Sequence, residues 1–101
     1  MKELEYCSWL NGRPKQLMLI KMTREKFQTL VGCQFKELGD ERGKEWATGF
    51  YLESIGQIAI IQYEHFPEIL EVLVEPGIES VYAKSILLNE FRISEESIDA
   101  P

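Results

Sequence analysis

The sequence predicts a single α+β domain, in which a mainly antiparallel sheet of about five strands carries two helices on one face in the order ββαβββα. Three patterns lead to this prediction. Segments rich in strand formers surround residues 11–12, apolar residues recur at helical spacing within 24–38, and two further strand-like segments flank residues 55–56. A chain of 101 residues with 45% apolar and 28% charged residues has the size and composition of one globular domain.

The first two predicted strands cover about 4–10 and 16–22. Between them lies Asn11-Gly12, a dipeptide typical of tight hairpin turns, here within a longer loop that includes Pro14. We therefore expect these two strands to pair with each other.

A helix is predicted between Thr23 and Gly39. Thr23 is a good N-cap residue, and Gly39 is a typical residue just past a helix end. The charged stretch 39–45 (GDERGKE) is predicted to be a loop. The apolar side chains that share one face of this helix are Phe27, Leu30, Val31, Phe35 and Leu38.

The second half of the chain begins with strands at 46–54 and 57–64, joined by a tight turn at residues 55–56. The second of these strands is apolar on both faces, which is typical of a central strand. Segment 68–75 fits a helix that starts at a proline, and it also fits a strand. The strand is favoured because β-branched residues are frequent in it and Pro76 follows it.

A second helix is predicted over 79–91, after Pro76-Gly77. The globular domain is expected to cover 1–94, and 95–101 is expected to be a polar, frayed tail.

Charge is distributed unevenly along the chain, whose net charge is −6. Residues 1–44 hold nine Lys and Arg against six Asp and Glu. Residues 45–83 hold seven Glu and no Lys or Arg at all, and residues 84–101 hold two basic and four acidic residues. Like charges on neighbouring strands repel each other by up to about 1 kcal/mol, so stability alone does not favour such a cluster.

We interpret this acidic stretch as a docking surface for a basic partner protein, because fixed carboxylates accelerate association and set specificity. The alternative is a solvated face that confers solubility, or one neutralised in space by Lys and Arg from residues 1–44. Tyrosines suit an interface because they bury much area with few rotatable bonds, whereas Phe50 and Phe66 are expected in the core. The predicted partner-binding residues are Tyr51, Glu53, Tyr63, Glu64, Glu68, Glu71 and Glu75.

No catalytic residue, metal site or cofactor is predicted. His65 is the single histidine, and Pro67 interrupts the helical geometry that would place it on one face with neighbouring carboxylates. Cys7 and Cys33 are interpreted as buried thiols. The glycines are scattered and form no phosphate-binding loop, and no motif assigns the chain to a known family.

Location and partner class follow from composition. No apolar segment approaches the roughly 20 residues that a membrane helix requires, and the N-terminus lacks the pattern of a signal peptide, so a cytoplasmic location is expected. An acidic chain with pI near 4.8 is a poor match for nucleic acid or an anionic membrane.

The sequence favours a small inhibitor or immunity protein that blocks a basic toxin or nuclease, by analogy with the charge complementarity of such complexes. One alternative is a non-catalytic subunit or adaptor, including a homodimer in which the basic half meets the acidic half of another copy. A second alternative is a small-molecule binding domain with a pocket lined by Trp9, Trp46 or Tyr63.

Overall fold

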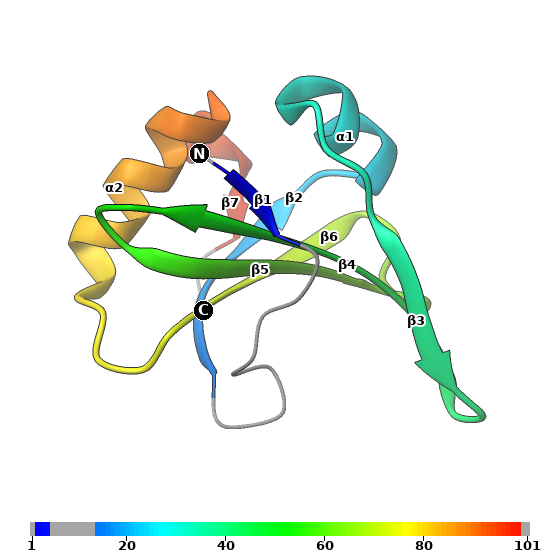
Figure 1. The fold of residues 1–101 in the computed structure, drawn as a ribbon. Helices are drawn as coiled ribbons and strands as arrows, with labels where there is room; N and C mark the ends of the chain where they lie inside the picture. Colours follow the sequence, from blue (N-terminus) through cyan, green and yellow to red (C-terminus); the bar gives the residue numbers. More distant parts are fainter. Residues whose placement is uncertain (1, 5–13, 100–101) are drawn as a thin grey trace.

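The computed structural model describes residues 2–4 and 14–99, which form a two-layer α+β fold (Figure 1). Six strands follow one another in the order β1-β4-β5-β6-β2-β7, and β3 pairs with β4 outside that path. Every pair is antiparallel. The predicted class is confirmed, and the sheet has more strands than predicted. In chain order the elements are β1 (Lys2–Leu4), β2 (Lys15–Lys21), α1 (Arg24–Val31), β3 (Lys36–Asp40), β4 (Gly43–Leu52), β5 (Gly56–Tyr63), β6 (Ile69–Val74), α2 (Ser80–Phe91), the 3-10 helix η1 (Glu95–Ser97) and β7 (Ile98–Asp99).

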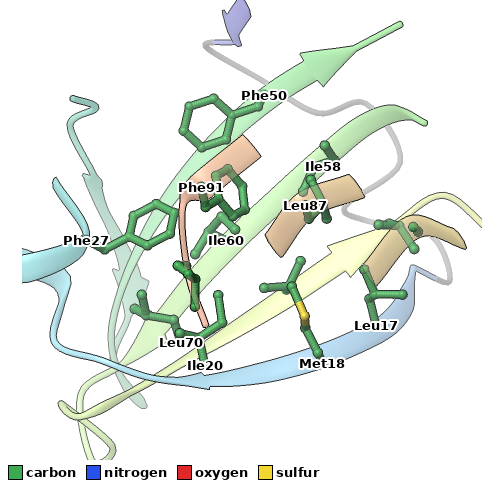
Figure 2. Close-up of a cluster of buried hydrophobic side chains, with 14 of the residues drawn as sticks. Leu17, Met18, Ile20, Phe27, Phe50, Ile58, Ile60, Leu70, Leu87 and Phe91 are labelled. Atoms are coloured by element: carbon green, nitrogen blue, oxygen red, sulfur yellow. The ribbon is translucent and has the colours of Figure 1, made fainter. Parts of the chain in front are cut away.

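Both helices pack on the same face of the sheet, as predicted (Figure 1). The ring of Phe91 in α2 lies 5.1 Å from that of Phe27 in α1 and 5.8 Å from that of Phe50 in β4, measured between centroids. Figure 2 shows Phe27 and Phe91 side by side, with Phe50, Ile60 and Leu70 around them. Burial of each such side chain contributes about 1.5–3 kcal/mol, so this contact fixes the helices to the sheet.

The central strand β5 is apolar on both faces, as the sequence predicts. Ile58 and Ile60 belong to the core beneath the helices, whereas Ala59 and Ile61 join a smaller buried cluster with Leu73. Successive side chains of a strand point to opposite faces. The smaller cluster therefore marks the sheet surface away from the helices, which we call the second face.

The first helix is shorter than predicted. Thr23 is its N-cap, as expected, and accepts a hydrogen bond from Lys26 N at 3.2 Å. The helix ends at Val31 rather than near Gly39, because Gly32 adopts a left-handed conformation (φ 80°) and donates its N–H to Gln28 O. A left-handed residue interrupts the helical hydrogen-bond series, and glycine adopts it without steric cost.

The residues predicted as the end of this helix and the loop after it form a hairpin instead. β3 pairs with β4 from Lys36 opposite Ala47 to Asp40 opposite Gly43. Phe35, just before β3, still packs against Phe27 at 5.9 Å between ring centroids. The apolar spacing that resembles a helical face thus arises from a helix and a separate extended segment that contact the same core.

The first predicted strand, at about 4–10, lies outside the described residues except for Leu4, so its pairing with 16–22 stays a prediction. Lys2 to Leu4 pair with Tyr51 to Gly49 of β4, and β2 pairs with β6 and β7. The predicted turn at residues 11–12 lies outside the described part of the chain.

The elements predicted at 68–75 and 79–91 agree with the structure. Segment 68–75 contains β6, so the strand interpretation is confirmed, and the helix expected over 79–91 is α2. The segment predicted as a polar tail contains η1 and β7. There Ile98 packs against the main core and pairs with Ile20 of β2.

We expect Phe91→Ala to lower the free energy of unfolding by about 3–5 kcal/mol, because it leaves a cavity between both helices and the sheet. Tyr82→Ala is the matched control on the same helix. Since Tyr82 is 52% exposed, its loss should change stability by about 0.5 kcal/mol or less. Urea unfolding of both variants measures the difference, and equal losses would contradict this account of the core.

Candidate functional site

The structure divides the seven predicted partner-binding residues between two ends of the β4–β5 hairpin. Tyr63, Glu64, Glu68 and Glu71 lie at or near one end, and the other three lie near the turn that joins β4 to β5. Tyr51 is opposite Gln57 at that turn, which places it about 20 Å along β5 from Tyr63. The seven residues therefore do not form one site.

The first end contains four neighbouring polar side chains on the second face, which we call the Tyr63–Glu71 cluster (Gln16, Glu45, Tyr63 and Glu71). The Tyr63 hydroxyl donates to Glu71 Oε1 at 2.6 Å, and the Gln16 amide donates to Glu71 Oε2 at 2.8 Å. Each of β5, β6 and β2 contributes one of these three side chains. The sheet thereby holds the half-buried Glu71 carboxylate in a fixed orientation.

Negative charge concentrates around Tyr63. Burial raises the pKa of its phenol, and the hydrogen bond to Glu71 and the charges of Glu71 and Glu45 raise the pKa further. Glu45 lies directly opposite Tyr63 on β4. The phenol thus stays protonated as a donor, flanked by two carboxylates.

The side chains next to this cluster are apolar or basic. Leu38 of β3, 42% exposed, lies opposite Glu45, and on the other side Lys21 lies opposite Ile69. Lys36 shares the second face, since it pairs with Ala47. Lysines from residues 1–44 thus share a face with these carboxylates, but among the described residues none forms an ion pair with Glu45 or Glu71.

Other carboxylates of the acidic stretch accept hydrogen bonds from backbone N–H groups. Glu64 accepts from Lys44 N at 2.9 Å and returns a backbone bond to Lys44 O, which closes the open end of the hairpin. Glu79 is the N-cap of α2 and accepts from the backbone N–H groups of Val81 and Tyr82. These hydrogen bonds lower the pKa of Glu79.

Glu68 lies by a groove of about 640 Å³ between the β5–β6 turn and the start of α1, where Lys21 and Lys26 also line the wall. Phe66 lines this groove as well and is 58% exposed, so its predicted place in the core is wrong. It belongs to a turn in which its N–H donates to Tyr63 O. A side chain at the tip of such a turn has no sheet neighbour to pack on.

At the other end of the hairpin, Tyr51 is 44% exposed on the second face, opposite Lys2. This agrees with the expected alternation, since Phe50 is buried beneath the helices. Glu53 is exposed in the turn, and the carboxylate of Glu75 lies directly over the backbone of Gly56. Only Tyr51 of these three faces outward beside a basic residue of a neighbouring strand.

Sequence reasoning missed Gln16 and Glu45 as parts of the site. Glu45 belongs to the acidic stretch, but its place opposite Tyr63 follows from a strand register that one sequence does not specify. Gln16 reaches Glu71 only because β2 pairs with β6, across a register shift between Gln16 and Met18.

The described residues include no group of three or more His, Cys, Asp or Glu side chains placed to hold a metal ion. Cys33 is a buried free thiol, and burial raises its pKa to about 11, so it is protonated at neutral pH and a poor nucleophile. His65 is exposed in the β5–β6 turn. Cys7 lies outside the described residues.

None of the described helices has the length and apolar character needed to cross a membrane.

Comparisons of the chain with protein-family models, with characterised proteins and with solved structures find no match.

We expect Gly56→Ala to destabilise the protein more than Gly77→Ala. Both glycines have left-handed φ values, 99° and 93°, but only at Gly56 does an added Cβ meet a side chain, the Glu75 carboxylate. The backbone term costs about 1–2 kcal/mol in each variant. At Gly56 the end of the flexible Glu75 side chain must also move, which adds at most about 0.5 kcal/mol. In urea unfolding, the Gly56→Ala substitution made in a Glu75→Ala background should lower the free energy of unfolding by as much as Gly77→Ala does. No difference between the single variants would show that Glu75 does not cover Gly56.

We expect Glu71→Gln to move the ionisation of Tyr63 to lower pH, because it removes the charge that opposes tyrosinate. The pKa should remain above the ordinary value, since burial is unchanged. A raised pKa means that the folded protein holds this proton more tightly, so stability is lost as the pH rises above about 10. Ultraviolet titration measures the shift, Tyr63→Phe assigns the signal, and Glu75→Gln should leave it unchanged.

Proposed function

We propose that the protein is a non-catalytic protein-binding module that engages a basic partner through the Tyr63–Glu71 cluster. The observation that carries this proposal is the Glu71 carboxylate, held by the Tyr63 hydroxyl and the Gln16 amide on the surface of the sheet. A carboxylate held in place by its neighbours loses little conformational entropy when a partner binds.

The chemistry of the cluster favours an Arg or Lys side chain of the partner. Glu45 and Glu71 flank Tyr63. The ion pairs of the described residues are Arg24–Glu25 and Lys44–Glu37, so neither of these two carboxylates has a cationic partner there. Tyr63 is 37% exposed and supplies an aromatic surface beside the two charges. Tyrosine beside complementary charge is a frequent combination at interface hot spots.

Within this class, the finer proposal is a small inhibitor or immunity protein that covers a basic surface of a toxin or nuclease. Its support is the acidic, preorganised cluster on a small domain, together with the use of charge complementarity in inhibitor complexes. A non-catalytic subunit or adaptor of a larger assembly is the second candidate. Lys21 and Lys36 beside the carboxylates favour it, because mixed charges allow contact with another copy or with a mixed-charge surface.

A small-molecule site between Trp46 and Tyr63 receives no support. Trp46 pairs with Gln62, so it lies on the helix face, where the Arg24 guanidinium covers its ring at 4.2 Å from the centroid. Tyr63 lies on the second face. Trp9 is outside the described residues.

The test uses three immobilised proteins: the wild type, the double variant E45K/E71K, and the control E90K/E96K, which reverses two carboxylates on the helix side. Proteins captured from a lysate of the producing cells are washed at low and then high salt and identified by mass spectrometry. We expect a basic protein on the wild type and on E90K/E96K. Its affinity for E45K/E71K should fall about a hundredfold or more, because each juxtaposition of like charges costs several kcal/mol.

Capture of the same proteins by all three would contradict the proposed site, provided that urea unfolding shows E45K/E71K to be folded. If E45K/E71K loses a partner that is neutral or acidic, the cluster is the binding surface but the proposed positive charge of the partner is wrong.

A further inference from the structure

A groove of about 980 Å³ runs along α2 and is lined by residues of α2, η1 and β7. One helical stripe forms its first wall, with Val81, Lys84, Leu88 and Arg92 at intervals of three to four residues. The facing wall includes Ile98 of β7. The groove lies on the helix side of the sheet, whereas the Tyr63–Glu71 cluster lies on the second face.

The groove presents apolar surface to solvent. Val81 is 75% exposed, the highest value among the large apolar side chains of the described residues. Leu88 and Ile98 are only partly buried where they pack against the core. An apolar side chain as exposed as Val81 contributes little to folding by burial, but it offers a contact surface to a ligand.

The positive charge of this region is concentrated in the same groove. Lys84 and Arg92 are the only basic residues that the sequence holds after residue 44, and both line the groove. Among the described residues neither has an ion-pair partner. Glu95, on the facing wall, is the one carboxylate of the lining. Two cations beside apolar surface are complementary to an acidic, partly apolar segment.

The backbone at Arg92 gives a second, independent reason to assign a role to its side chain. Arg92 is the C-cap of α2 with φ 57° and ψ 44°, and it is the only described non-glycine residue with positive φ. Glycine adopts this conformation without steric cost and is the usual residue there. An arginine that bears this strain and lines a groove fits a residue kept for ligand contact.

We propose that this groove binds an acidic segment of a partner protein. Apolar side chains of the segment contact Val81 and Leu88, and its carboxylates bind Lys84 and Arg92. Binding there is independent of the Tyr63–Glu71 cluster, because the two surfaces lie on opposite sides of the sheet. The protein can therefore hold two different segments at once, one basic and one acidic.

The test is a selection of random linear peptides, displayed on phage, for binding to the wild-type protein. We expect recovered sequences that combine Asp or Glu with Leu, Ile or Val. One recovered peptide, synthesised with a fluorescent label, is then titrated with variants by fluorescence anisotropy. R92G should weaken binding about ten- to hundredfold, the loss expected for one charge-assisted hydrogen bond. K84Q should weaken binding in the same direction.

Two controls separate the site from general effects. R92G replaces a left-handed arginine by glycine, so its thermal midpoint should equal or exceed that of the wild type and loss of binding cannot reflect unfolding. K36Q removes one positive charge on β3, outside the groove, and should leave peptide affinity unchanged.

Three outcomes would overturn the proposal. The first is that the selection recovers mainly basic peptides or no peptide. The second is that R92G and K36Q weaken peptide binding equally. The third is that the wild type self-associates and R92G abolishes that self-association. The last outcome would assign the groove to a second copy of the chain.

Discussion

The contact of Phe91 with Phe27 and Phe50 is the interaction on which the other features depend. It joins α2, α1 and β4 in one buried cluster. Both helices pack on the same face of the sheet. In the described part of the chain, the opposite face therefore carries only side chains of the strands. The Tyr63–Glu71 cluster exists on that face for this reason, and the α2 groove exists because α2 is held above the edge at β7.

The acidic stretch is tolerated in part because three of its seven carboxylates accept hydrogen bonds rather than pair with cations. Glu64 binds a backbone N–H at the end of a hairpin, and Glu79 binds two at the start of a helix. Glu71 accepts from two neutral side chains. Hydrogen bonds to a charged acceptor favour the ionised carboxylate, which offsets part of the repulsion between like charges on neighbouring strands. The lack of Lys and Arg in this stretch therefore does not by itself identify a docking surface.

The sequence predicted elements well where one local signal dominated and poorly where two signals competed. Thr23 was recognisable as an N-cap, and β5 as a central strand, because cap chemistry and two-sided hydrophobicity are local properties. The helix was predicted too long because Phe35 and Leu38 continue the apolar spacing of Phe27. Only the left-handed Gly32 ends the helix, and a glycine inside a helical pattern is ambiguous without the β3–β4 pairing.

By itself the sequence determined the α+β class, the alternation that places Phe50 inward and Tyr51 outward, and the concentration of carboxylates after residue 44. The tertiary structure decided which of those carboxylates are neighbours. Glu45, Tyr63 and Gln16 come from segments that are distant in sequence, and strand order and register bring them to Glu71. Lys84 and Arg92 follow one stripe of α2 and its C-cap, but the groove has a facing wall only because the chain returns through η1 and β7. Register depends on the packing of whole faces against the core, a non-local property that local sequence patterns do not encode.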